Sequence, residues 1–218
     1  MNDIFQEVDD AMRQEKLQKI WSEYKATIIT AIIILIATTA LGSAYKAWDH
    51  NKNAVNTEKL SMALNSENKE EALTDFIPSA RAQHRAMAQL ALVDLYFEQK
   101  DKESALALLS QMVKKGSTPK FYRDQARLLF FVHSDANQDV DVLKPVIARK
   151  KSPFTWHARI EASGFYAEQG DFDQAIKLLK PFEAETLLPA KLKKQASDLL
   201  FLYEYDQQAL QKALMAKE

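Results

Sequence analysis

Residues 96–109 have the sequence YFEQKDKESALALL, and a related segment, YAEQGDFDQAIKLL, occupies residues 166–179, 70 positions later. Both copies begin with an aromatic residue, continue with Glu-Gln, and place an Asp sixth and an Ala tenth. Similarity at a fixed offset is the signature of a repeat architecture, in which each repeat is one supersecondary unit stacked on its neighbours.

Fainter copies fill the interval and flank it. Residues 142–145 (VLKP) match residues 178–181 (LLKP) at an offset of 36, and Phe130 takes the place of the leading aromatic residue. Weaker copies begin at residues 69–73 (KEEAL) and 208–210 (QAL). About five units with a period of 33 to 36 therefore run from near residue 50 to the end, which predicts an α-solenoid of helical hairpins. Four Gly and six Pro in 218 residues agree with an all-α fold.

The repeated residue types suit the packing of two helices. Aromatic residues on the first helix fill the space inside a hairpin, and small residues let the second helix approach closely. The predicted structural positions are Tyr96, Ala105, Leu109, Phe130, Tyr166, Gly170, Ala175 and Leu179. Glycine permits the turn between the helices, and the Asp after it can cap the next helix. Pro119, Pro153 and Pro189 are expected to separate one hairpin from the next.

Residues 26–45, ATIITAIIILIATTALGSAY, contain no charge, although 27% of the chain is charged. As a helix, a stretch of this length covers about 30 Å, the thickness of the hydrocarbon core of a bilayer. Aromatic residues flank it at Trp21, Tyr24, Tyr45 and Trp48, as at membrane interfaces. The sequence thus predicts a short amphipathic segment (1–25), one transmembrane helix (26–45) and a repeat domain (46–218).

Two alternatives to an intact anchor exist, a buried soluble helix and a cleaved signal peptide ending near residues 42–44 (GSA). Six acidic residues within the first 25 make a poor signal-peptide start. Basic residues near the span are slightly more numerous before it than after it: Arg13, Lys16, Lys19 and Lys25 against Lys46, Lys52 and Lys59. This bias favours an N-terminus in the cytoplasm and a body on the other side.

Small residues inside the span form two small-xxx-small pairs, Thr38 with Gly42 and Ala40 with Ala44, which could pack on another membrane helix. Before the span, apolar residues at helical spacing predict an amphipathic helix within residues 1–25. That helix could rest on lipid or dock on a protein, and its acidic first half favours the protein.

No pattern for catalysis or cofactor binding is present. The chain lacks Cys, and its four Gly (42, 116, 164, 170) build no phosphate-binding loop. Four scattered His lack the spacing of metal ligands, so each is expected to be a surface or hairpin residue. A net charge of −1 gives no reason to expect nucleic acid. We therefore expect no enzyme activity, no cofactor or metal, and no small-molecule substrate, but protein partners and a membrane.

The repeats resemble tetratricopeptide repeats. Counted from Ala86, the aromatic, alanine and leucine of the first copy fall at positions 11, 20 and 24, and the same holds for the second copy counted from Trp156. Val93 and Ser163 depart from the usual small residue at position 8. A short N-terminal segment, one span and such a body together resemble the ancillary Sec translocon subunit family of the bacterial inner membrane.

That resemblance implies a periplasmic body that associates with translocon subunits, a periplasmic chaperone and exported client proteins. The expected function is a membrane-anchored adaptor assisting exported proteins at the translocon. The alternative is a scaffold tethering division or wall-synthesis complexes, because the repeats of this family also resemble those of a cell-division coordinator.

The repeat alignment makes a direct prediction about two alanines. Ala105→Arg and Ala175→Arg should each destabilise the fold by several kcal/mol, since a charged side chain would be forced between packed helices. Lys177→Ala, on an outward-facing position, should change stability little. Thermal denaturation followed by circular dichroism would measure all three. Melting of both arginine variants like the parent would show that the repeats are misaligned.

Overall fold

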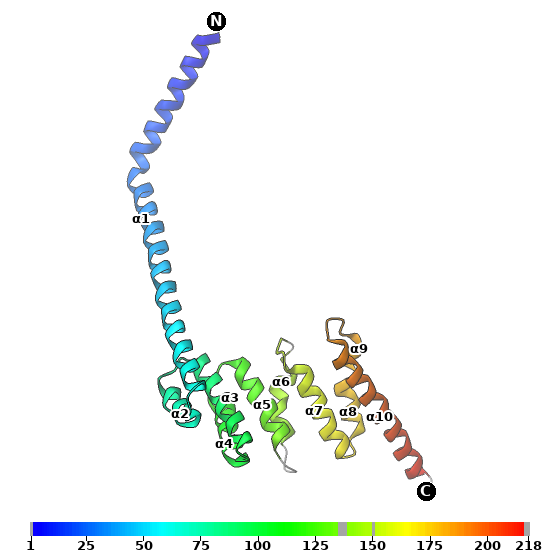
Figure 1. Ribbon diagram of the computed structural model, residues 1–218. Coiled ribbons are helices and arrows are strands. Elements are labelled where there is room, and N and C mark those ends of the chain that lie inside the picture. Colours follow the sequence, from blue (N-terminus) through cyan, green and yellow to red (C-terminus); the bar gives the residue numbers. More distant parts are fainter. Residues whose placement is uncertain (1, 135–138, 150, 216–218) are drawn as a thin grey trace. The chain divides into compact units, whose positions relative to one another are not determined.

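The computed structural model (Figure 1) describes residues 2–134, 139–149 and 151–215. Within these ranges, the side chains of 2–11, 13–23, 25–28, 31–32 and 213–214 lie outside the description. Every regular element of the described chain is helical, as the sequence predicts. Contacts divide the chain into two units, one ending at Val55 and one beginning at Asn56, and each is described by itself.

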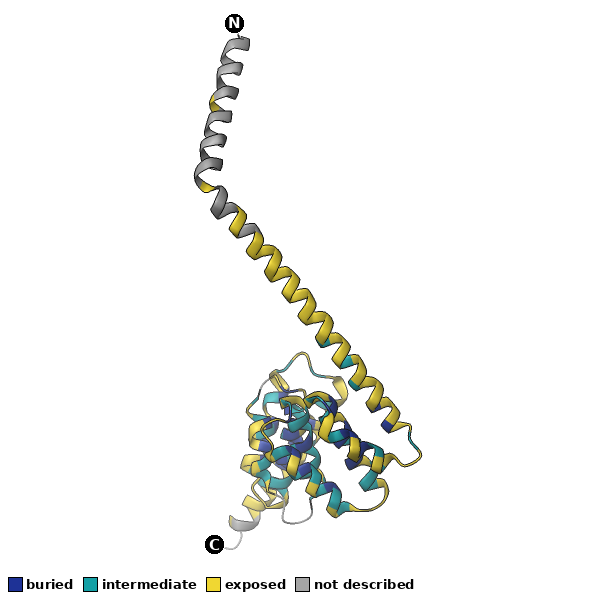
Figure 2. Ribbon diagram, turned by 90° about the vertical axis from the view of Figure 1, so that its left-hand side faces the viewer, coloured by how far each residue is buried: buried dark blue, intermediate teal, exposed yellow. Residues whose placement is uncertain are grey.

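The first unit lies within one helix, α1 (Asn2–Leu64), which continues into the second unit. The predicted boundaries after residues 25 and 45 fall inside this helix, and the second unit begins at Asn56 rather than at residue 46. Figure 2 shows the described middle of α1 almost entirely exposed. Within the described residues, no helix combines the length and apolarity needed to cross a membrane. Within the predicted amphipathic segment 1–25, the structure describes the side chains of Met12 and Tyr24 alone, and five side chains of the predicted span also lie outside the description.

The second unit is a row of antiparallel helices, each packed on the next (Figure 1). After the end of α1 come α2 (Lys69–Ser79), α3 (Ala82–Glu98), α4 (Lys102–Lys114), α5 (Lys120–His133), the 3₁₀ helix η1 (Val140–Leu143), α6 (Lys144–Ile147), α7 (Thr155–Glu168), α8 (Phe172–Leu179), α9 (Pro181–Ala184) and α10 (Ala190–Met215). Pro119 and Pro189 lie immediately before α5 and α10, and Pro153 lies two residues before α7, at the predicted separations.

Among the described residues, four hairpins and one final helix form this row, whereas the sequence predicted about five hairpins. The hairpins pair the end of α1 with α2, α3 with α4, α5 with η1 and α6, and α7 with α8. The unit predicted at residues 208–210 is wrong, because these residues lie inside the continuous helix α10. At the offset of 34 that aligns residues 208–210 with residues 174–176, Glu204 and Tyr205 stand where Gly170 and Asp171 form the turn and the cap. The helix therefore meets neither the left-handed turn residue nor the capping Asp that end the first helix of the clear copies.

The turn of the two clear copies is the same in detail. Lys100 and Gly170 both have a left-handed backbone, with φ of 62° and 77°. In each turn the next residue, Asp101 or Asp171, donates its N–H to the carbonyl of the leading tyrosine, at 2.8 and 2.9 Å. This bond closes the first helix as a Schellman motif. The same Asp caps the second helix, accepting the N–H of Ser104 or Gln174. The predicted glycine turn and Asp cap are confirmed.

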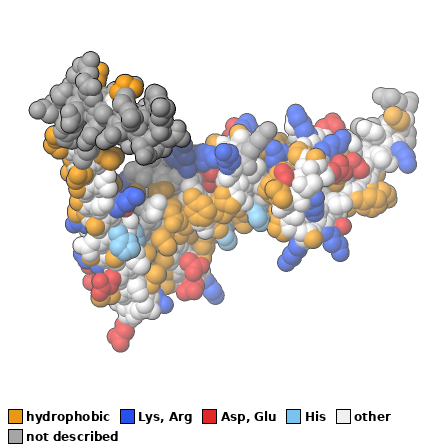
Figure 3. Space-filling model, turned by 90° about the horizontal axis from the view of Figure 1, so that it is seen from above, with side chains coloured by type: hydrophobic (Ala, Val, Ile, Leu, Met, Phe, Trp, Pro, Cys, Tyr) orange, Lys and Arg blue, Asp and Glu red, His pale blue; other side chains and the backbone are white. Residues whose placement is uncertain are grey.

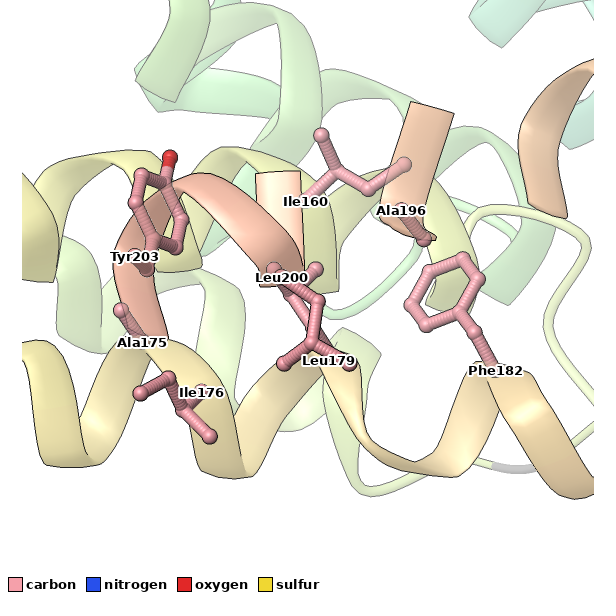
Figure 4. Close-up of a cluster of buried hydrophobic side chains, with 8 residues drawn as sticks. All are labelled: Ile160, Ala175, Ile176, Leu179, Phe182, Ala196, Leu200 and Tyr203. Atoms are coloured by element: carbon pink, nitrogen blue, oxygen red, sulfur yellow. The ribbon is translucent and has the colours of Figure 1, made fainter. Parts of the chain in front are cut away.

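Small and apolar side chains fill the interfaces between the helices. Ala105, Leu109 and Ala175 have no exposed surface, and Leu179 is 1% exposed. Figure 4 shows the last cluster, in which side chains of α7, α8, α9 and α10 meet around Leu179 and Leu200. Tyr96 packs against two successive clusters, so the core continues from one hairpin to the next.

The left-handed turn predicts opposite effects at equivalent positions. Lys100→Gly should raise stability by about 0.5–1 kcal/mol, because a side chain is strained at positive φ, and Gly170→Ala should lower it by about 1 kcal/mol. Denaturant unfolding would measure both changes. Lys100→Ala is the matched control, since it removes the amine but keeps Cβ. Equal stabilisation by Lys100→Ala and Lys100→Gly would contradict a conformational cause.

Candidate functional site

The predicted repeat positions act in packing. Ala105, Leu109, Ala175 and Leu179 are buried as expected. The three aromatic positions are half-buried and lie at the margins of the clusters: Tyr96, Phe130 and Tyr166. Two of the eight positions also line surface hollows: Tyr96 borders a groove between α2, α3 and α4, and Leu179 borders a smaller pocket beside α10.

The four predicted membrane-packing positions are exposed on α1: Thr38, Ala40, Gly42 and Ala44. A Cβ built on Gly42 would meet nothing within 4 Å. The hydroxyl of Thr38 donates to the carbonyl of Ile34 at 2.8 Å, and that of Thr39 donates to Leu35 at 2.7 Å. These hydroxyls are thus satisfied by their own helix. Packing on a membrane helix stays a prediction.

A groove with a volume of about 590 Å³ lies between α2, α3 and α4. We call it the α2–α4 groove. Its lining consists of Thr74, Ile77 and Pro78 of α2, Gln89, Leu92 and Tyr96 of α3, and Ser104, Ala107, Leu108 and Gln111 of α4. On each helix these residues follow the spacing of a single face, so three helical faces converge on one space.

The lining of the α2–α4 groove carries no formal charge. It combines apolar surface, such as Ile77, Leu92 and Leu108, with amides and hydroxyls. Burial raises the pKa of the Tyr96 phenol, and the negative charges of Glu70 and Asp101 raise it further. Tyr96 therefore stays protonated and can donate a hydrogen bond. Such a lining suits a neutral, partly apolar ligand.

Sequence reasoning missed this groove. It identified Tyr96 as a packing residue but did not consider Gln89 or the outer face of α4. Residues 104, 107, 108 and 111 form a stripe on one helical face, but all of residues 104–113 are uncharged, so the sequence does not distinguish this stripe from the other faces. The stripe becomes recognisable only when the positions of α2 and α3 are known.

A smaller pocket of about 290 Å³ lies near the end of the row. Trp156 and Arg159 of α7 line it, and Glu185 faces it from the loop after α9. The guanidinium of Arg159 is 5.7 Å from the centre of the Trp156 ring and donates to the carbonyl of Leu178 at 3.4 Å. Burial lowers the pKa of Arg159. The Arg159 guanidinium contacts Trp156 of α7 and the carbonyl of Leu178 on α8, which favours a role in packing α7 on α8.

A buried charged cluster joins α5 to the segment before α7. Asp124 is 1% exposed. Its carboxylate accepts hydrogen bonds from the guanidinium groups of Arg127 and Arg149 and, at 2.8 Å, from the hydroxyl of Ser152. The partners from the later segment lie 25 and 28 residues away along the chain, so no local pattern predicts the cluster.

Among the histidines, His84 is buried on α3, and its Nε2 lies 3.0 Å from the hydroxyl of Thr57 at the end of α1. Burial and the nearby charge of Arg81 lower its pKa, so the imidazole is neutral near pH 7. The contact holds the last part of α1 against α3. In the described part of the chain, no group of three His, Asp or Glu side chains is arranged to bind a metal.

Comparison with known proteins identifies no relative: no family model, no curated protein and no solved structure matches the chain.

The Asp124 cluster predicts a large effect of one substitution. Asp124→Ala should destabilise the body by about 3–5 kcal/mol, because two arginines would lose their buried counter-charge. Urea unfolding followed by circular dichroism would measure the loss. Asp141→Asn is the control, since Asp141 forms an exposed ion pair with Lys144 and its loss should leave stability unchanged. Similar effects of the two substitutions would contradict the assigned role of Asp124.

Proposed function

We propose that this chain is a membrane-anchored adaptor that binds proteins and assists exported chains at the Sec translocon, together with periplasmic chaperones. The observation that supports the proposal is the α2–α4 groove. Three helices of a solenoid line it, its lining is uncharged, and its volume is about 590 Å³. Solenoids present such surfaces to segments of other proteins. The groove lining offers no carboxylate, imidazole or amine, which favours binding over acid–base catalysis.

The proposed anchor is the part of α1 formed by residues 26–45. Several large apolar side chains there are more than half exposed, including Ile33, Leu35 and Leu41. A helix with exposed isoleucines and leucines needs an apolar surrounding, which a bilayer provides. The hydroxyls of Thr38 and Thr39 bond to the carbonyls of their own helix, so they need no water.

We propose that the N-terminus lies in the cytoplasm and the body in the periplasm of a bacterial inner membrane. The support is the slight excess of basic residues before residue 26. The predicted order of segment, span and repeat body resembles that of the ancillary translocon subunits, and this resemblance supports the choice of partners. A tether at the membrane raises the local concentration of the body near a membrane-embedded partner, so even weak binding becomes effective.

Site-specific photo-crosslinking in living cells tests this function. Probes at exposed positions of α2 and α4 in the full chain should capture translocon subunits, a periplasmic chaperone or exported chains in transit. A probe at Met12, which is 50% exposed on α1, is the topological control and should capture no periplasmic protein. Capture of only division or wall-synthesis proteins from the body would reject the translocon function in favour of a scaffold. Periplasmic capture at Met12 would reject the topology.

A further inference from the structure

We infer that a basic surface, formed by the first half of α5 and the segment between α6 and α7, binds an acidic segment of a partner protein through its carboxylates. The members of this basic surface are Lys120, Arg123, Arg127, Arg149 and Lys151. None of them lines the α2–α4 groove, so the basic surface is separate from the one on which the proposed function rests.

Basic residues are concentrated in the two stretches that form this surface. Residues 114–127 and 145–159 together contain nine Lys and Arg but a single acidic residue, Asp124, in a chain whose net charge is −1. Asp124 is 1% exposed and already pairs with Arg127 and Arg149. The accessible part of both stretches is therefore positively charged and attracts groups of the opposite charge.

Two contacts bring the stretches together at one end of the row. The carboxylate of Asp124 accepts hydrogen bonds from Arg149 and Ser152, which lie 25 and 28 residues later. The rings of Phe121 and Phe154, from the same two stretches, lie 5.2 Å apart between their centres. The start of α5 and the segment before α7 thus lie side by side, at the upper ends of these helices in Figure 1. Figure 3 looks onto these ends, and Lys and Arg side chains gather there over the middle of the body.

Positive charge is not balanced within the basic surface. Asp124 carries one negative charge, whereas three guanidinium groups lie near it, because Arg123 is one helical turn before Arg127 on the same face of α5. Burial lowers the pKa of Arg127, and the charges of Arg123 and Arg149 lower it further, although Asp124 opposes them. The Nε of Arg123 is buried without a hydrogen-bond partner in the described chain. A second carboxylate beside these arginines would relieve their mutual repulsion.

The exposure of the arginines favours a protein side chain over a flat anionic surface. The side chains of Arg127 and Arg149 are only 15% and 34% exposed, whereas Lys120 and Lys151 are exposed. A membrane surface would contact mainly the lysines, but an Asp or Glu side chain can reach a recessed guanidinium and accept two parallel hydrogen bonds from it. Phe121, which is 50% exposed, offers an apolar contact to a neighbouring side chain. The basic surface thus fits an acidic segment that also carries an apolar residue.

Peptide binding to the full chain in nanodiscs of zwitterionic lipid tests the inference. The probes are fluorescent nine-residue peptides with blocked ends: one of Glu, Leu and Ser, a second in which Gln replaces every Glu, and a third in which Lys does. Fluorescence anisotropy should show binding of the Glu peptide alone, and added salt should weaken it by screening the charges. Equal binding of the Gln peptide would overturn the inference. So would displacement of the Glu peptide by an equal concentration of inorganic phosphate, which would identify a phosphate site instead.

Charge-reversal variants locate the site. Lys120→Glu combined with Lys151→Glu should weaken binding of the Glu peptide about tenfold. Lys177→Glu combined with Lys212→Glu changes the net charge equally and should weaken it less than about twofold, because these lysines lie on α8 and α10. All four lysines are exposed, so both double variants should melt like the parent. Equal weakening by the two double variants would show general charge attraction and overturn the location.

Arg123 tests the role of the arginines themselves. Arg123→Gln should weaken binding of the Glu peptide about tenfold, the loss of roughly one charge-assisted hydrogen bond. Arg123→Lys keeps the charge and should weaken binding less. Unchanged binding by Arg123→Gln would overturn recognition by the arginines. Binding of the Glu peptide that depends on Arg123, with no translocon protein or exported chain crosslinked in cells, would support the basic surface and reject the proposed function.

Discussion

The close approach of neighbouring helices at alanine positions is the constraint on which the rest of the body depends. Ala105, Ala126, Ala158 and Ala175 have no exposed surface, so a larger side chain at any of them would separate two helices. Since each hairpin leaves an apolar face that only the next hairpin covers, this spacing sets the position of every later helix. The α2–α4 groove exists because α2 and α4 both pack against α3 at such distances while leaving its stripe from Gln89 to Tyr96 accessible.

Buried polar groups modify this stacking at a few places. Asp124 connects α5 to the segment before α7, where the second helix of the hairpin is reduced to η1 and the short helix α6. A charge-assisted cluster replaces part of the apolar interface that a longer helix would provide. His84 makes a smaller connection of the same kind, since its Nε2 lies 3.0 Å from the hydroxyl of Thr57 and joins α3 to the end of α1.

The sequence was sufficient for the fold where its signals were local. The aromatic residue, the left-handed turn and the Asp cap lie within six consecutive positions, so residues 96–101 and 166–171 predicted their hairpin turn correctly. It failed at residues 208–210, where three matching residues lacked the turn before them and a continuous helix formed. It could not predict the Asp124 cluster or the α2–α4 groove, because these join residues more than one helix apart, and their side chains carry no pattern until the helices are placed.

Helix α10 has one face that no other described residue covers. Phe201 and Tyr205 of α10 are 75% and 65% exposed, on the side away from the buried Ala196 and Leu200. Such a face is the helical counterpart of an unpaired edge strand, onto which further layers can add without limit. Lys194, Asp198 and Glu204 are exposed on the same helix. An added layer would have to remove water from these charges, so the free energy of desolvation opposes the stacking of a further layer on this face of α10.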